Sequence, residues 1–237
     1  MVKMKNMLFP LLMVMGIGSA PTMQALSGAE RAKIKLQLDR ALQNDLPLSG
    51  QLINQLRRGG EKALAAEYAA KLDKVMADNM GLLVGVAQDL HETHFTLANA
   101  ARAHAGDRAN VETIASNIAK SASERVLQLA NLLRKAKDYS LLGVWEPAVK
   151  AAVSQQLAVR ALNEQVQDAN AVAGVQKIRN AAAALAALRG PTELVNVRVG
   201  AAIREPNPVQ RAPIIERVKE AAGQASVAAR AIIGAMR

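Results

Sequence analysis

Apolar residues recur at three- and four-residue steps along most of this chain, the spacing of an amphipathic α-helix. The first such stretch covers residues 27–43 and begins with a capping box, in which Ser27 and Glu30 can each bind a backbone N–H group of the other. Residues 47–50 contain Pro and Gly and are predicted as a turn. A short helix then follows and is expected to end at the Gly59–Gly60 pair.

The middle of the chain predicts three longer helices. One apolar stripe extends over residues 64–97, before a break at Gly106–Asp107. Residues 111–137 form the most regular pattern, and residues 139–144 connect it to a helix that begins near Pro147. Proline is tolerated in the first turn of a helix, because the backbone N–H that it lacks has no intrahelical acceptor there.

The last third predicts a helix that ends at Gly190–Pro191 and a segment, residues 194–199, that is either helical or irregular. Residues 204–208 contain two prolines and are predicted as a linker. The chain thus divides into an N-terminal segment, a helical bundle, the linker and a basic amphipathic helix, at residues 1–25, 26–203, 204–208 and 209–237. We expect the last helix to be separable from the bundle.

Composition agrees with a helical fold. The 237 residues are 51% hydrophobic but only 2% aromatic, so the core must be packed from Ala, Leu, Val and Ile. Alanine has the highest helix propensity and buries little area per residue. We therefore predict an all-α protein, an elongated bundle of long Ala-rich helices with thin seams between them.

The N-terminus resembles a secretory signal in its layout. Lys3 and Lys5 precede an apolar run over residues 7–20, and small Ala25 marks a cleavage position. The apolar run is shorter than the roughly 20 residues that span a bilayer as a helix. We expect export to the periplasm or the medium. The alternative is a retained N-terminal segment on a membrane-associated or virion protein.

The net charge of +10 is concentrated at the C-terminal end: residues 170–237 carry ten basic and four acidic side chains. Basic residues flank the apolar face of the last helix, as in an interfacial membrane helix or in an ordinary bundle helix. The candidate residues for contact with an acidic partner or surface are Arg211, Arg217, Lys219, Arg230 and Arg237. Nucleic acid is a weaker candidate, because this region has no aromatic side chain on which bases could stack.

Little else in the sequence points to chemistry. The chain has no cysteine, which excludes disulfides, thiolate metal sites and cysteine nucleophiles. His91 and His94 lie one helical turn apart and are candidate metal ligands, although a histidine in a helix seam is the commoner explanation for His94. No nucleophile or phosphate-binding motif is present, so we expect no enzymatic activity and no cofactor.

The leading hypothesis is a non-enzymatic, exported binding or assembly protein, such as a scaffold, adaptor or structural subunit. Its partner would be another protein, a second copy of itself, or an anionic membrane surface. The alternatives are a membrane-active protein, such as a pore subunit or a virion ejection component, and a metal-binding protein that uses the histidines.

Overall fold

A computed structural model of the chain describes residues 25–136, 138–168 and 172–236. The predicted signal segment therefore lies almost wholly outside the described residues. The described part is helical and contains no strand, in agreement with the predicted all-α fold. Its helices are α1 (Gly28–Asn44), α2 (Leu46–Arg58), α3 (Lys62–Ala103), α4 (Gly106–Leu133), the 3₁₀ helix η1 (Tyr139–Val144), α5 (Trp145–Asp168), α6 (Val172–Arg204) and α7 (Pro208–Met236).

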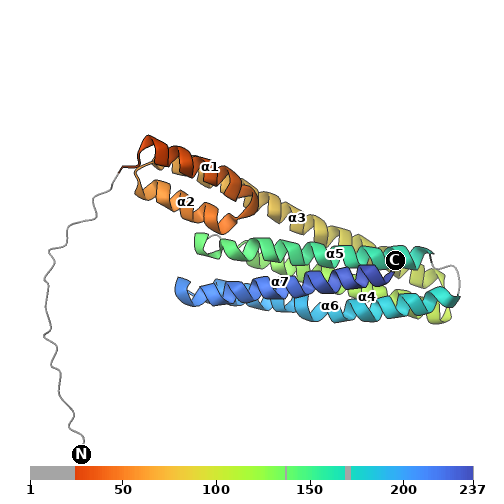
Figure 1. Ribbon diagram of the computed structural model, residues 1–237. Coiled ribbons are helices and arrows are strands. Elements are labelled where there is room, and N and C mark those ends of the chain that lie inside the picture. Colours follow the sequence, from red (N-terminus) through yellow and green to blue (C-terminus); the bar gives the residue numbers. More distant parts are fainter. Residues whose placement is uncertain (1–24, 137, 169–171, 237) are drawn as a thin grey trace, which may run out of the picture.

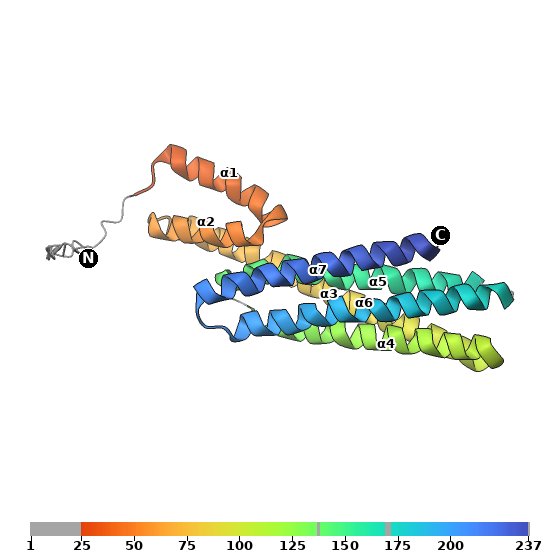
Figure 2. The ribbon, with the colours of Figure 1, turned by 60° about the horizontal axis from the view of Figure 1, so that its bottom comes forward.

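The molecule is an elongated bundle. Helices α3 to α7 lie along one long axis, and α1 and α2 pack on the N-terminal part of α3 at one end (Figures 1 and 2). The 42 residues of α3 extend over about 63 Å at the usual helical rise. The η1 segment lies at the same end as α1 and α2, whereas α7 ends at the opposite end (Figure 1).

The core is a continuous seam of aliphatic side chains, as the composition predicts. Leucine and alanine dominate it, and it extends from α1 to α7. Two aromatic side chains are buried and each has a polar partner: Tyr68 donates to Asp39 Oδ1 at 2.7 Å, and Trp145 Nε1 donates to the carbonyl of Ala136 at 3.1 Å.

The starts of α1 and α2 follow local capping chemistry. The Ser27–Glu30 capping box is confirmed, with α1 beginning at Gly28. The turn predicted over residues 47–50 is wrong, because these residues form the first turns of α2. The Asp45 side chain caps this helix by accepting from the N–H of Leu48, and Pro47 lies where no N–H is required.

The helix end predicted at Gly190–Pro191 is also wrong. Helix α6 continues through this pair to Arg204, so residues 194–199 are helical. A residue before proline is normally driven out of the α conformation by a clash that involves its Cβ. Gly190 has no Cβ, which lets the helix pass Pro191 with one backbone hydrogen bond missing.

Helix α7 follows the predicted linker and packs along α5 and α6. Its apolar face is part of the common core, with Val218, Ala221 and Ala225 fully buried. This favours the alternative that the sequence left open, an ordinary bundle helix with a solvated rim.

Candidate binding surfaces

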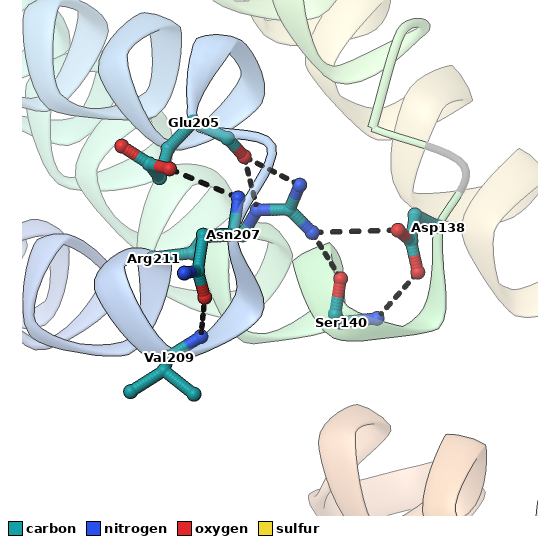
Figure 3. A network of polar contacts seen from close by, with 6 residues as sticks. All are labelled: Asp138, Ser140, Glu205, Asn207, Val209 and Arg211. Atoms are coloured by element: carbon teal, nitrogen blue, oxygen red, sulfur yellow. Dashed lines mark hydrogen bonds and ion pairs between the residues drawn. The ribbon is translucent and has the colours of Figure 1, made fainter.

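Arg211 is a buried anchor and not a surface cation. Only 6% of the residue is exposed, and its guanidinium binds three groups at the start of α7 (Figure 3). Its Nε and Nη2 atoms donate to the carbonyl of Glu205 at 3.0 and 2.6 Å, and Nη1 donates to Ser140 and to Asp138 Oδ2, the latter at 3.3 Å. Arg211 therefore ties the α6–α7 connection to η1.

The other predicted cations do not form one cluster. Three of them are exposed and spread along α7: Arg217, Lys219 and Arg230. Lys219 pairs with Glu216 at 2.8 Å, which neutralises part of the charge. Arg237 lies outside the described residues.

A groove passes over η1 between α2 and α7. Two adjoining cavities, of about 450 and 310 Å³, share Pro47, Gly143 and Lys219 in their walls. The helices approach closely here: a Cβ on Gly143 would lie 2.8 Å from Ile215 Cγ2. Charges of both signs line the groove, among them Asp45, Glu146, Lys150 and Glu216, so its electrostatics select no single class of ligand.

A second hollow, of about 540 Å³, lies where α3, the end of α4 and the start of α5 meet. Met76, Met80 and Trp145 form part of its wall, and Asp73 and Arg134 also line it. It has the size of a small-molecule site but is open to solvent on one side.

The histidines face different partners. His94 Nδ1 lies 2.8 Å from Ser116 Oγ of α4, so this side chain belongs to the α3–α4 seam. The His91 ring is exposed and packs edge-on against Phe95. Within the described ranges, no group of three or more His, Cys, Asp or Glu side chains could hold a metal ion.

Two carboxylates hold helices together. Glu112 of α4 is fully buried and binds His104 Nδ1 at 2.8 Å and Arg108 Nε at 3.0 Å, at the α3–α4 turn. Asp89 of α3 accepts two hydrogen bonds from Arg160 of α5, at 2.8 and 2.6 Å. The hydrogen bonds from Arg160 lower the pKa of Asp89 below its ordinary value. Both arrangements contribute to structure.

The surface that sequence reasoning missed is on α6. Six uncharged residues at alternating steps of four and three form what we call the outer α6 face: Ala183, Ala187, Gly190, Leu194, Val197 and Ala201. Leu194 is 41% exposed and Val197 is 59% exposed. The predicted helix end at Gly190–Pro191 divided this pattern into two short pieces, which concealed it.

In the part of the chain that the structure describes, no helix is both long enough and apolar enough to cross a membrane. Comparison with protein-family models, with curated proteins and with solved structures finds no match to this chain.

Proposed function

We propose that this protein is a non-enzymatic helical assembly protein, and that it binds its partner through the outer α6 face. One observation carries the proposal: α6 is apolar on two opposite sides. Its inner side supplies core residues such as Leu185, Leu188 and Val199, and its outer side presents Leu194 and Val197 to solvent. A contiguous exposed apolar patch on a protein surface commonly marks a contact site for another molecule.

Exposed charged side chains occur on every long helix of the bundle, and on α6 they include Arg189 and Glu193. On the other helices they include Glu92 on α3, Lys120 and Glu124 on α4, Lys150 and Arg160 on α5, and Glu216 and Glu220 on α7. No charged residue occurs among the six positions of the outer α6 face. This uncharged stripe beside exposed charges supports a contact surface on α6.

A basic side chain of α7 lies beside this face and can contact acidic groups of a partner. Arg198 of α6 donates a hydrogen bond to the backbone carbonyl of Arg217, so α7 borders the outer α6 face on that side. We propose that Arg217 contributes to a charged rim around the apolar contact. Rim charges raise the association rate more than the affinity, and salt screens them.

We also propose that the protein acts after export. The N-terminal pattern supports this, together with a capped first helix that begins at Gly28, three residues beyond the predicted cleavage position. Sequencing of the N-terminus of protein from its source cells tests it. A start at Leu26 is the expected result, and an intact Met1 would overturn export by this route.

Thiol accessibility tests the contact surface. Because the chain has no cysteine, a Val197→Cys variant carries a single thiol on the outer α6 face. In cells that produce the protein, we expect this thiol to react much more slowly with a maleimide than the thiol of a matched Val227→Cys variant. Val227 is a suitable control, since it is 60% exposed on α7 and outside the outer α6 face. Equal reaction rates in the two variants would rule the proposed surface out.

A further inference from the structure

We propose that the partner on the outer α6 face is a second copy of this chain, and that the two α6 helices pair side by side in parallel about a two-fold axis. This inference rests on the assembly function proposed above and specifies the partner.

The spacing is that of a coiled-coil seam. From residue 183 to residue 201 the apolar positions follow steps of four, three, four, three and four. This is the heptad a/d pattern, which brings one stripe of a helix into continuous contact with a second helix. In a parallel pair each position meets its own copy, so Leu194 packs on Leu194 of the partner subunit and Val197 on the partner's Val197.

The charges select both the partner and its direction. Glu193 and Arg198 lie on opposite flanks of the seam, at the g and e positions of consecutive heptads. In a parallel pair, a g residue faces the e residue five positions further along the other helix. Two symmetric contacts between Glu193 and the partner's Arg198 then form.

An antiparallel pair with the same apolar layers would bring Glu193 against Glu193 of the partner subunit, because g faces g in that arrangement. Like charges so placed repel each other. The two flanks of the seam also have different neighbours within the molecule. The Arg198 flank borders α7 and its exposed Arg217, and the opposite flank borders α4, where Asn196 donates to the carbonyl of Arg125 at 2.9 Å.

The backbone leaves room for close approach. Figure 2 shows α6 running between α7 and α4. The residues Ala183, Ala187 and Gly190 are small, and a Cβ on Gly190 would meet no atom within 4 Å apart from its chain neighbours and the backbone of its own helix. Helices with small residues at such positions can approach closely along their backbones. Leu194 and Val197 then supply the larger buried surface.

Cysteine crosslinking tests the arrangement in the purified full-length chain. A parallel two-fold axis places residue 197 opposite itself, close to the Cα separation of about 5.5 Å that a disulfide needs. We expect Val197→Cys to form a covalent dimer on mild oxidation and Val227→Cys to remain monomeric. In an antiparallel pair Val197 faces the partner's Ala187. Crosslinking only in a mixture of Ala187→Cys and Val197→Cys chains would therefore overturn the parallel arrangement.

Charge exchange provides a second test, by sedimentation equilibrium. Glu193→Arg and Arg198→Glu should each weaken self-association about ten-fold or more, because each places like charges at two symmetric contacts. Mixing the two variants should restore dimers, since Arg at 193 then faces Glu at 198, and Arg198 still faces Glu193. Circular dichroism checks that both variants keep their helical content. Failure of the mixture to recover association would overturn the pairing.

The result for the unmodified chain separates this inference from the proposed function. A monomer at every soluble concentration would overturn self-pairing. If Val197→Cys were still protected in the producing cells, the outer α6 face would keep its role as a contact surface for another partner. A third outcome is a monomer whose Val197→Cys thiol is protected only while residues 1–25 are present. It would identify the N-terminal segment as the occupant of the outer α6 face and would also overturn self-pairing.

Discussion

The guanidinium of Arg211 lies 3.3 Å from the Asp138 carboxylate, 73 residues earlier in the chain. The contact joins α7 to η1 at the end of the bundle where α2 also packs. Asp138 itself is fixed by the N–H of Ser140, which lowers the pKa of its carboxyl group. A cation that the sequence marks for an external partner thus acts inside the molecule.

Replacing Arg211 by alanine should lower the free energy of unfolding by about 1.5–3 kcal/mol, the usual range for lost hydrogen bonds of a charged group. The matched change Arg40→Ala, at an exposed position of α1, should alter it by no more than about 0.5 kcal/mol. Urea unfolding followed by circular dichroism measures both. Equal midpoints for the two variants would show that the Arg211 contacts contribute nothing.

Gly143→Ala should destabilise the protein by about 1–3 kcal/mol, because the new Cβ would overpack against Ile215. Gly223→Ala is the natural comparison. It lies within α7, where an added Cβ meets nothing within 4 Å, so it should stabilise the protein by up to about 1 kcal/mol through helix propensity. The two substitutions are chemically identical, and opposite shifts in thermal midpoint are the expected result.

Pro191→Ala should stabilise α6 by about 1–3 kcal/mol, since it supplies the N–H that the carbonyl of Ala187 lacks. Gly190→Ala alone should be neutral or destabilising while Pro191 remains, because its Cβ would clash with the proline ring. In the Pro191→Ala background, Gly190→Ala should raise the free energy of unfolding by about 1 kcal/mol. A double-mutant cycle measures this coupling, and strict additivity would contradict it.

Truncation of the chain after Arg204 should remove cooperative unfolding or lower the thermal midpoint strongly. It would expose the surfaces of α5 and α6 that now cover Val218, Ala222 and Ala225. Dye binding to the exposed apolar surface and thermal melting report the effect. A truncated chain that melts like the intact protein would instead show that the last helix is separable, as the sequence analysis predicted.

Acid should weaken the α3–α5 contact through Asp89. Its pKa is depressed in the folded state below the ordinary value of 3.8, mainly by the hydrogen bonds from Arg160. Its contribution to stability is therefore complete above that value and is lost as the pH falls through the folded-state pKa. Asp89→Asn should be less stable than the parent at neutral pH and should lose less stability between about pH 5 and pH 2. Identical slopes of unfolding free energy against pH would contradict this.

Local signals predicted the fold well. The Ser27–Glu30 box and the apolar periodicity depend on residues within one or two helical turns, and the structure confirms both. The errors came from prolines. Pro47 begins a helix and Pro191 lies inside one, and the local features that accompany them are the cap from Asp45 and the missing Cβ of Gly190.

The candidate surfaces were harder to predict, because their character depends on residues far apart in sequence. Arg211 is buried by Asp138 and Ser140, which no pattern along α7 reveals. The outer α6 face becomes visible only when residues 183–201 are read as one helix and when its other side is known to be covered by the bundle.

The order of the helices also bears on how the chain acquires its structure. Successive long helices lie against one another, so many of the contacts form between segments that are near each other in sequence. Chains dominated by such local contacts fold in microseconds to milliseconds. We expect α3 and α4 to associate first, because only the two residues between Ala103 and Gly106 separate them, and α7 to close the bundle last. Until that closure, the part of the inner α6 surface that α7 covers stays exposed, and the incompletely folded chain presents apolar residues on two sides of one helix.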